Sequence, residues 1–230
     1  MAKKALKTEN EGGRDAAKIA TLWGVFVFFL LLFIDLVTKV AADVYFNTDG
    51  NPKSIEIIPW GVLSLCIEYN PGIAFGSFGG SEAPVKIAIV AGTALVMIFL
   101  TIAYFRMDAR RTFMRGSLVF VVAGGVGNLI DRLYYQIWIP SEYGVRDMVQ
   151  LDFSPLFEKW FGWETNFMNF GVCNIADFFI VGGAIALVFA FLFFDSEAFV
   201  PVGKYKALAK EAEAREAAKA EEKKAKKAGK

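Results

Sequence analysis

Four long apolar runs constrain the fold of this 230-residue chain more than any other feature of its sequence. A helix needs about 20 mostly apolar residues to cross the hydrocarbon core of a bilayer. The runs are continuous stretches such as WGVFVFFLLLFI rather than the one-sided pattern of a soluble helix. The third run is rich in small residues, chiefly Gly, which lets helices approach closely. The sequence predicts an all-α integral membrane protein whose four transmembrane helices span about residues 19–40, 86–105, 116–133 and 175–194.

The first run has a second interpretation, because a basic segment followed by an apolar run is also typical of a secretory signal peptide. Asp35 and Lys39, however, lie where a cleavage region should be small and neutral, and three more apolar runs follow. We therefore expect a retained transmembrane helix.

The Lys and Arg residues outside the spans are concentrated on one side of the expected membrane. Nineteen lie in the N-terminal segment 1–21, the loop 106–115 and the tail from 195 onward. The two long loops, 43–83 and 136–173, carry three. Because cytoplasmic loops are enriched in Lys and Arg, both termini are expected in the cytoplasm and both long loops outside it.

These features divide the chain into three parts. A basic cytoplasmic segment, 1–18, precedes a four-helix membrane domain, 19–195, and a cytoplasmic tail, 196–230, ends the chain. The tail is rich in Ala, Lys and Glu, so we expect it to be solvated and partly helical.

The two long loops differ in composition. Residues 43–80 contain short β-prone runs, SIEIIPW and VLSLCIEY, among Gly, Pro and Asn, which predict a small extracytoplasmic β-sheet resting on the membrane. The 136–173 loop is rich in aromatic side chains, which suit an interfacial loop or helix. These aromatic residues include Trp138, Phe153, Phe157, Trp160, Phe161 and Trp163.

The composition excludes several kinds of chemistry. The chain has no His, which removes His triads, a His general base and His metal ligands. Cys66 and Cys173 are the only cysteines, so neither a zinc cluster nor a disulfide framework can form. One bridge between them could form in an oxidising compartment, but two free cysteines are the preferred interpretation. We expect no metal, no organic cofactor and no nucleic-acid partner.

Apart from Lys86, the first residue of the second span, five charged residues lie in the predicted spans, where charges are costly and usually functional. Asp35 and Lys39 come late in the first span, Asp131 and Arg132 late in the third, and Asp177 early in the fourth. The first and third spans run outward and the fourth runs inward. All five groups are therefore expected near the same outer boundary.

Each of these charges also has a purely structural explanation. Asp35 and Lys39 are one helical turn apart and can form a local ion pair. Asp131 or Arg132 can anchor a helix end, and Asp177 suits a helix N-terminus. Five polar groups at one depth are better explained by a functional site, particularly as three asparagines are expected nearby: Asn70, Asn128 and Asn174.

Without His, the hydrolytic device that such a site favours is a pair of carboxylates around a water molecule. One ionised carboxylate removes the proton of the water, and one protonated carboxyl donates to the substrate carbonyl. Two close acids in a low-dielectric site share one proton, which divides these roles. Asp177 is one member of this pair, and Asp131, Asp147 and Asp152 are the candidates for the other.

Five sequence blocks, in order on suitably placed spans, resemble the motifs of the lipoprotein signal peptidase (signal peptidase II) family. The family motifs are D-x-x-[ST]-K, N-x-G-x-A-F, G-G-x-x-G-N-x-x-D-R, V-V-D-F and F-N-x-A-D. The corresponding blocks are DLVTK (35–39), NPGIAFG (70–76), GGVGNLIDR (124–132), VRDM (145–148) and CNIAD (173–177). Each block alone is a weak signal, whereas five in order are specific.

The resemblance implies a bacterial inner-membrane aspartyl endopeptidase that acts near the extracytoplasmic face. Its implied substrates are diacylglyceryl-modified prolipoproteins, cleaved just before the lipidated Cys, with membrane lipids as surroundings and a monomer as the expected state. The implied catalytic pair is Asp147 and Asp177, with Asp35, Lys39 and Asp131 as structural residues near the site. The residues implied to bind or orient the substrate are Asn70, Gly72, Asn128, Arg132, Asn174 and Ala176.

The chain departs from the family pattern in three places. The connections 131–147 and 152–171 are longer than usual, and Cys173 replaces a Phe. The longer connections keep Asp152 as an alternative for the second acid. Cys173 is interpreted as a small apolar replacement, because a catalytic thiol would lack a His base.

Two other functions would also explain charges in transmembrane helices. An ion- or proton-coupled transporter predicts charges near the membrane midplane and internal symmetry, and the sequence has neither. A non-enzymatic membrane scaffold leaves the clustered Asp and Asn residues unexplained. We therefore prefer the peptidase interpretation.

Overall fold

The structure is a computed structural model. It describes residues 2–72, 83–138, 144–162, 167–194, 200, 202–203, 205–211, 213–214 and 217–218, with the backbone alone for 2–14, 16 and 83. The motif residues 73–76, Trp163 and the end of the tail, 219–230, lie outside the described residues.

Four helices within the described residues are long and apolar enough to cross a membrane, as the sequence predicts. They belong to α1 (Ala2–Asn47), α2 (Ala83–Arg106), α3 (Thr112–Arg132) and α5 (Ile175–Leu192). The third span continues from α3 through a π-helical turn, η3 (Leu133–Trp138).

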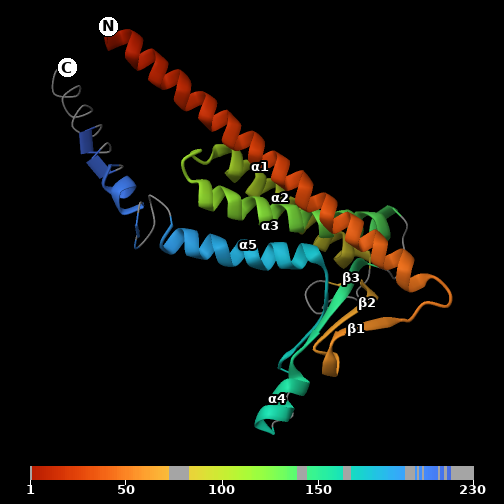
Figure 1. Cartoon of the computed structure of the whole chain (residues 1–230). Coiled ribbons are helices and arrows are strands. Elements are labelled where there is room, and N and C mark those ends of the chain that lie inside the picture. The colour runs from red at the N-terminus through yellow and green to blue at the C-terminus, as the bar shows by residue number, and fades with distance from the viewer. Residues whose placement is uncertain are drawn as a thin grey trace.

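Helix α1 is much longer than the predicted first span, 19–40. Its first residues, AKKALK, are Ala, Lys and Leu, which form helix readily in water, and no Pro lies between them and the apolar run. Figure 1 shows the resulting helix projecting past the others at its N-terminal end. An apolar run therefore predicts where the membrane is crossed, but not where the helix begins and ends.

Helix α3 is the central element of the bundle and packs against α1, α2 and α5. Its glycines allow this close packing, as the sequence predicts. A Cβ atom on Gly124 would lie 2.3 Å from the carbonyl oxygen of Ala176, and one on Gly127 would lie 2.3 Å from Oδ2 of Asp35. Below these contacts the core is apolar and includes Leu31, Tyr104, Leu118, Val119 and Ala123.

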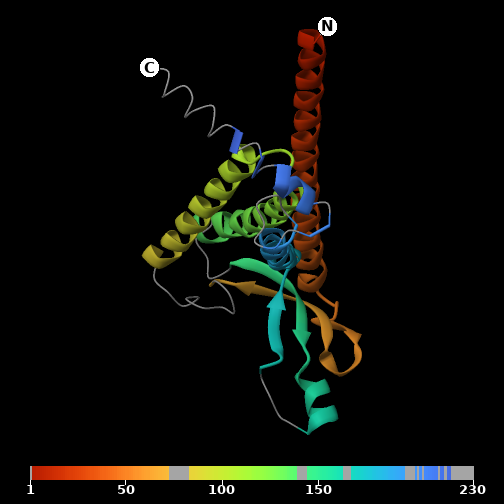
Figure 2. The same ribbon diagram turned by 90° about the vertical axis from the view of Figure 1, so that its left-hand side faces the viewer.

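A four-stranded antiparallel sheet leaves the bundle at the end where α5 begins (Figures 1 and 2). Its strands, in the spatial order β1-β2-β3-β4, are β1 (Ser54–Ile58), β2 (Leu63–Asn70), β3 (Val145–Asp152) and β4 (Asn169–Cys173). A short 3-10 turn, η1 (Pro59–Gly61), joins β1 to β2, and α4 (Ser154–Phe161) lies between β3 and β4.

The sheet is larger than the sequence predicts. The 136–173 loop contains the short helix α4, and it also supplies β3 and β4, half of the sheet. Phe153, Phe157, Trp160 and Phe161 lie in or next to α4. The strands on either side are short and mixed in character, which hides the pairing of β3 with β2 and of β4 with β3. Cys66 and Cys173 are both free in the structure, which agrees with the preferred interpretation.

The strand register brings predicted site residues from different parts of the chain close together. Asn70 at the end of β2 pairs with Val145, and Glu68 pairs with Asp147. The chain leaves β4 at Cys173 and enters α5 directly. The ends of β2 and β4, the start of β3 and the start of α5 therefore meet above α3.

Candidate active site

The N-terminus of α5 holds one of the two predicted catalytic acids. Asn174 is its N-cap, and its Oδ1 accepts a hydrogen bond from the backbone N–H of Asp177 at 3.1 Å. In return, Asp177 Oδ2 accepts one from the backbone N–H of Asn174 at 3.0 Å. This capping box satisfies two N–H groups that the first helical turn leaves unpaired. It fixes the half-buried Asp177 carboxylate where β4 meets α5.

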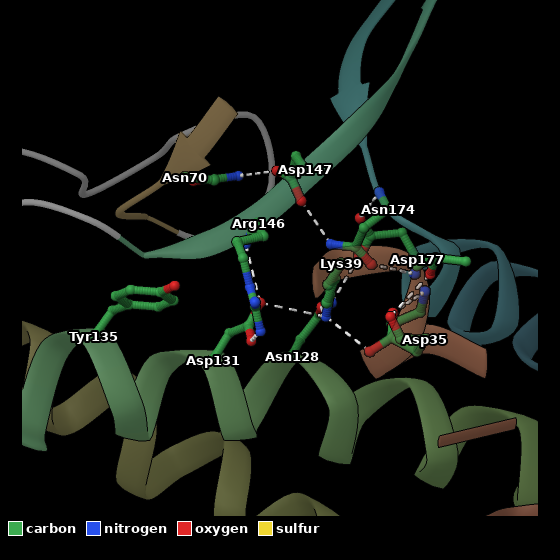
Figure 3. Close-up of polar contacts among 12 residues, drawn as sticks. Asp35, Lys39, Asn70, Asn128, Asp131, Tyr135, Arg146, Asp147, Asn174 and Asp177 are labelled. Atoms are coloured by element: carbon green, nitrogen blue, oxygen red, sulfur yellow. Dashed lines mark hydrogen bonds and ion pairs between the residues drawn. The ribbon is translucent and has the colours of Figure 1, made fainter. Parts of the chain in front are cut away.

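The other predicted acid, Asp147, lies on β3 with 3% of its surface exposed. Asn174 Nδ2 donates to its Oδ1 at 2.5 Å, and Asn70 Nδ2 donates to its Oδ2 at 3.1 Å (Figure 3). Burial raises the pKa of Asp147 to about 7, and the charge of Asp177 adds to this effect, while the two amide donors oppose it. Asp147 can therefore hold a proton near neutral pH.

A third asparagine connects Asp177 to a buried lysine. Asn128 on α3 donates from Nδ2 to Asp177 Oδ1 at 2.8 Å. Lys39 on α1 donates from Nζ to Asn128 Oδ1, also at 2.8 Å. Because Lys39 can only donate, it fixes which end of the Asn128 amide faces the acid. Asn128 is thus oriented to present N–H groups to Asp177.

Lys39 is also the centre of a buried charge cluster, since neither it nor Asp35 has any exposed surface. Its Nζ lies 2.8 Å from Asp35 Oδ2 and 3.7 Å from Asp131 Oδ2. Asp35 Oδ1 accepts a hydrogen bond from the backbone N–H of Ala176 at 3.0 Å. Asp35 thereby ties α1 to the first turn of α5, beside the Asp177 carboxylate.

Arg146 is a residue of the site that the sequence did not single out. Its backbone N–H donates to Asp131 Oδ2 at 3.0 Å, and its Nη2 donates to Asp131 Oδ1 at 2.7 Å. Its Nη1 lies 3.6 Å from Asp43 Oδ2, and its guanidinium lies over the ring of Tyr135. These contacts hold β3 to α1 and α3 on the side opposite Asp147. The available signal was the Arg in VRDM, where the family motif has Val.

The two acids border a cleft of about 560 Å³ between α2, α3, α5 and the sheet. Arg132, 8% exposed, contributes to its lining and donates from Nη2 to the carbonyl oxygen of Gly72 at 3.1 Å. Its Nε has no hydrogen-bond partner among the described residues. The remaining lining is mostly apolar and includes Met97, Val121, Leu151, Phe178, Ile180 and Val181.

The structure brings nearly all the predicted site residues into this region. Gly72 donates from its backbone N–H to Asn70 Oδ1 at 3.0 Å, which orients the amide that contacts Asp147. The alternative acid, Asp152, instead accepts hydrogen bonds from the Ser154 backbone and from Asn169 at the far end of β3. Asp131 is held by Arg146 and Lys39 behind the cleft. Of the three candidates for a partner to Asp177, Asp147 is the one that borders the cleft with it.

The arrangement suits proton transfer between two acids on either side of a bound group. Asn174 contacts both Asp147 and Asp177, and burial raises the pKa of Asp147. Among the described residues, no group of three or more Cys, Asp or Glu side chains is placed to hold a metal ion.

The fold and the site together define a membrane-embedded protein with an acid pair at the end of its helix bundle. Residues 27–193 match the sequence model of a family described as Signal peptidase (SPase) II, and the chain belongs to this peptidase family. The resemblance inferred from the five sequence blocks is thus confirmed.

Relatives from several bacteria agree with this assignment. The lipoprotein signal peptidase of Chlorobium phaeovibrioides is 30% identical over 181 residues, which cover 76% of this chain and 95% of that protein. That of Bartonella tribocorum is 30% identical over 161 residues, covering 70% and 84%. A solved bacterial membrane enzyme, determined by the in meso method, is similar in fold with a TM-score of 0.51 and 25% identity, over 74% of this chain and 92% of that one.

Proposed function

We propose that this protein is an aspartyl endopeptidase that removes the signal peptide from diacylglyceryl-modified prolipoproteins and cleaves just before the lipidated Cys. The family assignment supports the removal of signal peptides from prolipoproteins. The observation that supports the aspartyl mechanism is the pair Asp147 and Asp177, both in contact with Asn174 at the edge of the cleft.

The surroundings of the two acids favour different roles. Burial raises the pKa of Asp147 to about 7, so a substantial fraction of this carboxyl is protonated at neutral pH and donates a proton to the oxygen of the scissile carbonyl. Asp177 lies at a helix N-terminus and accepts hydrogen bonds from the Asn128 side chain and the Asn174 backbone N–H. Both the helix N-terminus and these hydrogen bonds stabilise a carboxylate. Asp177 removes a proton from the water as the water oxygen attacks the carbonyl carbon.

The second half of the reaction reverses these proton transfers. When the tetrahedral intermediate collapses, the C–N bond breaks and Asp177 gives its proton to the leaving amine. Asp147 takes back the proton of the hydroxyl group as the new carboxyl group forms. The pair is then ready for another cycle, with no cofactor required.

The rest of the site suits a lipid-anchored peptide. The free Nε–H of the buried Arg132 is available to a substrate main-chain carbonyl, and Asn70 lies beside Asp147 at the same edge. The apolar lining between α2 and α5 suits an acyl chain or an apolar signal-peptide segment. All of these groups come from one chain, which supports a monomeric enzyme.

The charge distribution supports the orientation. The sheet and the acids lie at the end of the bundle opposite the N-terminal segment, the 106–115 loop and the described residues of the tail, the parts of the chain where Lys and Arg are concentrated. We infer that this end faces the extracytoplasmic side of the bacterial inner membrane, where lipidated precursors are exposed.

The test of this function is cleavage of two matched precursors by the purified protein in detergent. One precursor carries diacylglycerol on its Cys, and the other has the same sequence with an unmodified Cys. We expect cleavage of the lipidated precursor alone, with the new N-terminus at the lipidated Cys by mass spectrometry. Equal cleavage of both would contradict a lipid-dependent peptidase, and cleavage of neither by well-folded protein would contradict the peptidase.

The raised pKa of Asp147 predicts a pH dependence of cleavage. If neutral Asp147 is the acid, kcat/KM should fall as the pH rises through about 7, by about tenfold per pH unit above that value. Initial rates measured from pH 5 to 9, with folding followed by circular dichroism, test this prediction. A kcat/KM that rises through pH 7 would instead make ionised Asp147 the active form and exchange the two roles.

A further inference from the structure

The part of the sheet away from the acids carries large apolar side chains, most of which lie outside the cleft. Trp160 and Phe161 on α4 are 71% and 58% exposed, and Trp60 on η1 is 57% exposed. Other exposed side chains in the same region are Ile57, Ile58, Phe153, Phe167 and Phe170. We call residues 57–60, 153–161 and 167–170 the aromatic arm. A cluster of exposed apolar side chains marks a contact with a partner or a membrane.

The tip of this arm is held in a defined conformation. Trp60 has φ = 66°, a left-handed value that is rare for a bulky residue, and Gly61 donates from its backbone N–H to Glu56 Oε1 at 2.7 Å. Lys159 of α4 lies over the Trp60 indole, with Nζ 3.7 Å from the ring centroid. The contact joins α4 to η1, so the two sides of the arm present their aromatic groups together.

The arm continues a surface that faces lipid. Figures 1 and 2 show the sheet leaving the end of α5 sideways, with α4 beside the bundle rather than above it along the helix axes. Phe178 and Val181 are exposed on the first turns of α5 and border the cleft, as does Phe170 of the arm. Phe170 contacts Phe153 edge to face, with ring centroids 6.1 Å apart. Apolar side chains of the α5 surface and of the arm thus line the same cleft.

The chemistry of the arm suits the boundary between lipid headgroups and acyl chains. Trp and other aromatic residues concentrate at this depth, and a short amphipathic helix can lie in its plane. Glu158 and Lys159 of α4 leave that helix with no net charge, so anionic headgroups are not needed. We propose that the aromatic arm is a membrane-interface anchor, which inserts α4 and Trp60 into the leaflet beside α5 and holds the sheet at a fixed depth.

Depth-dependent fluorescence quenching tests this proposal without reference to catalysis. A single cysteine is placed at Trp160→Cys, in a chain that carries Cys66→Ala and Cys173→Ala, and is labelled with an environment-sensitive dye. The full chain is reconstituted into phosphatidylcholine nanodiscs with or without lipids that carry a nitroxide high on the acyl chain. The matched control is Asp49→Cys, in the exposed polar turn between α1 and β1. Thermal unfolding in detergent checks that both labelled proteins are folded.

We expect the dye at 160 to be quenched at least several-fold more by the nitroxide lipid than by aqueous iodide, and the dye at 49 to show the reverse. Replacing half of the phosphatidylcholine with phosphatidylglycerol should leave the result unchanged. Quenching at 160 by iodide alone would overturn the proposal. Protection at 160 that develops only when lipidated precursor is added would overturn it too, because the arm would then bind substrate rather than lipid.

Discussion

Replacing Asp147 or Asp177 by Asn should reduce cleavage of a lipidated precursor by at least about 10²–10⁴-fold, the range that general acid–base groups contribute. An amide has the shape of a carboxyl group but can neither release nor accept a proton at neutral pH. Burial already disfavours the charged form of Asp147, so an uncharged Asn at this position should leave the folded state intact. Initial rates in detergent, with thermal unfolding measured alongside, test both effects.

The matched control for these variants is Asp152→Asn, which changes an acid on the same strand that hydrogen bonds away from the cleft. Its activity should stay within about threefold of wild type, because the change touches neither proton-transfer step. Activity that persists in Asp147→Asn but is lost in Asp152→Asn would move the second acid to Asp152. Loss in Asp131→Asn, without loss of folding, would move it to Asp131.

The arrangement of the spans could be predicted from the sequence because bilayer thickness sets the length of an apolar run. The same reasoning predicted that Asp35, Asp131 and Asp177 would meet at one end of the bundle, since the direction of each span follows from the flanking charges. This prediction needed no knowledge of how the helices pack. Helix lengths outside the membrane could not be predicted in this way, which is why α1 extends well beyond its apolar run.

The pairing of β2 with β3 could not be predicted from local patterns. Asn70 and Asp147 are 77 positions apart, and their contact depends on a strand register across three intervening helical segments. The family resemblance, rather than the residue pattern, selected Asp147 over Asp131 and Asp152. From residue types alone, the three acids were equivalent candidates.

The pattern of hydrogen bonds within the site also could not be predicted from the sequence. Whether Lys39 contacts Asp35 alone or Asn128 as well depends on how α1 is rotated about its axis relative to α3. Residue spacing along one helix does not determine this rotation. The position of Arg146 behind β3 likewise follows from strand alternation, which places adjacent residues on opposite faces. The sequence signal for the contacts between Arg146 and Asp131 was a charged residue next to a predicted catalytic acid.

The largest effect on stability is expected for Lys39→Met, which removes the positive charge from a cluster with no exposed surface. Asp35 would then be buried with only the Ala176 N–H to stabilise its charge. Breaking a buried ion pair in this way typically lowers the free energy of unfolding by about 3–5 kcal/mol. The free energy can be measured by unfolding in mixed micelles of increasing denaturing detergent. Lys18→Met is the control, because Lys18 forms an ion pair of the same i, i±3/4 kind on the same helix with both side chains more than 70% exposed, and no measurable change is expected.

The double variant Lys39→Met, Asp35→Asn separates the structural role of Lys39 from its role in the site. Removing both charges leaves no unpaired ion, so most of the lost stability should return. Cleavage should not return with it, because without Lys39 nothing fixes the Asn128 amide with its N–H groups toward Asp177. A double variant that regains both stability and full activity would show that Lys39 acts only through its ion pair with Asp35. One that regains stability but stays at least about tenfold slower than wild type would show that the Lys39–Asn128 contact positions the catalytic carboxylate.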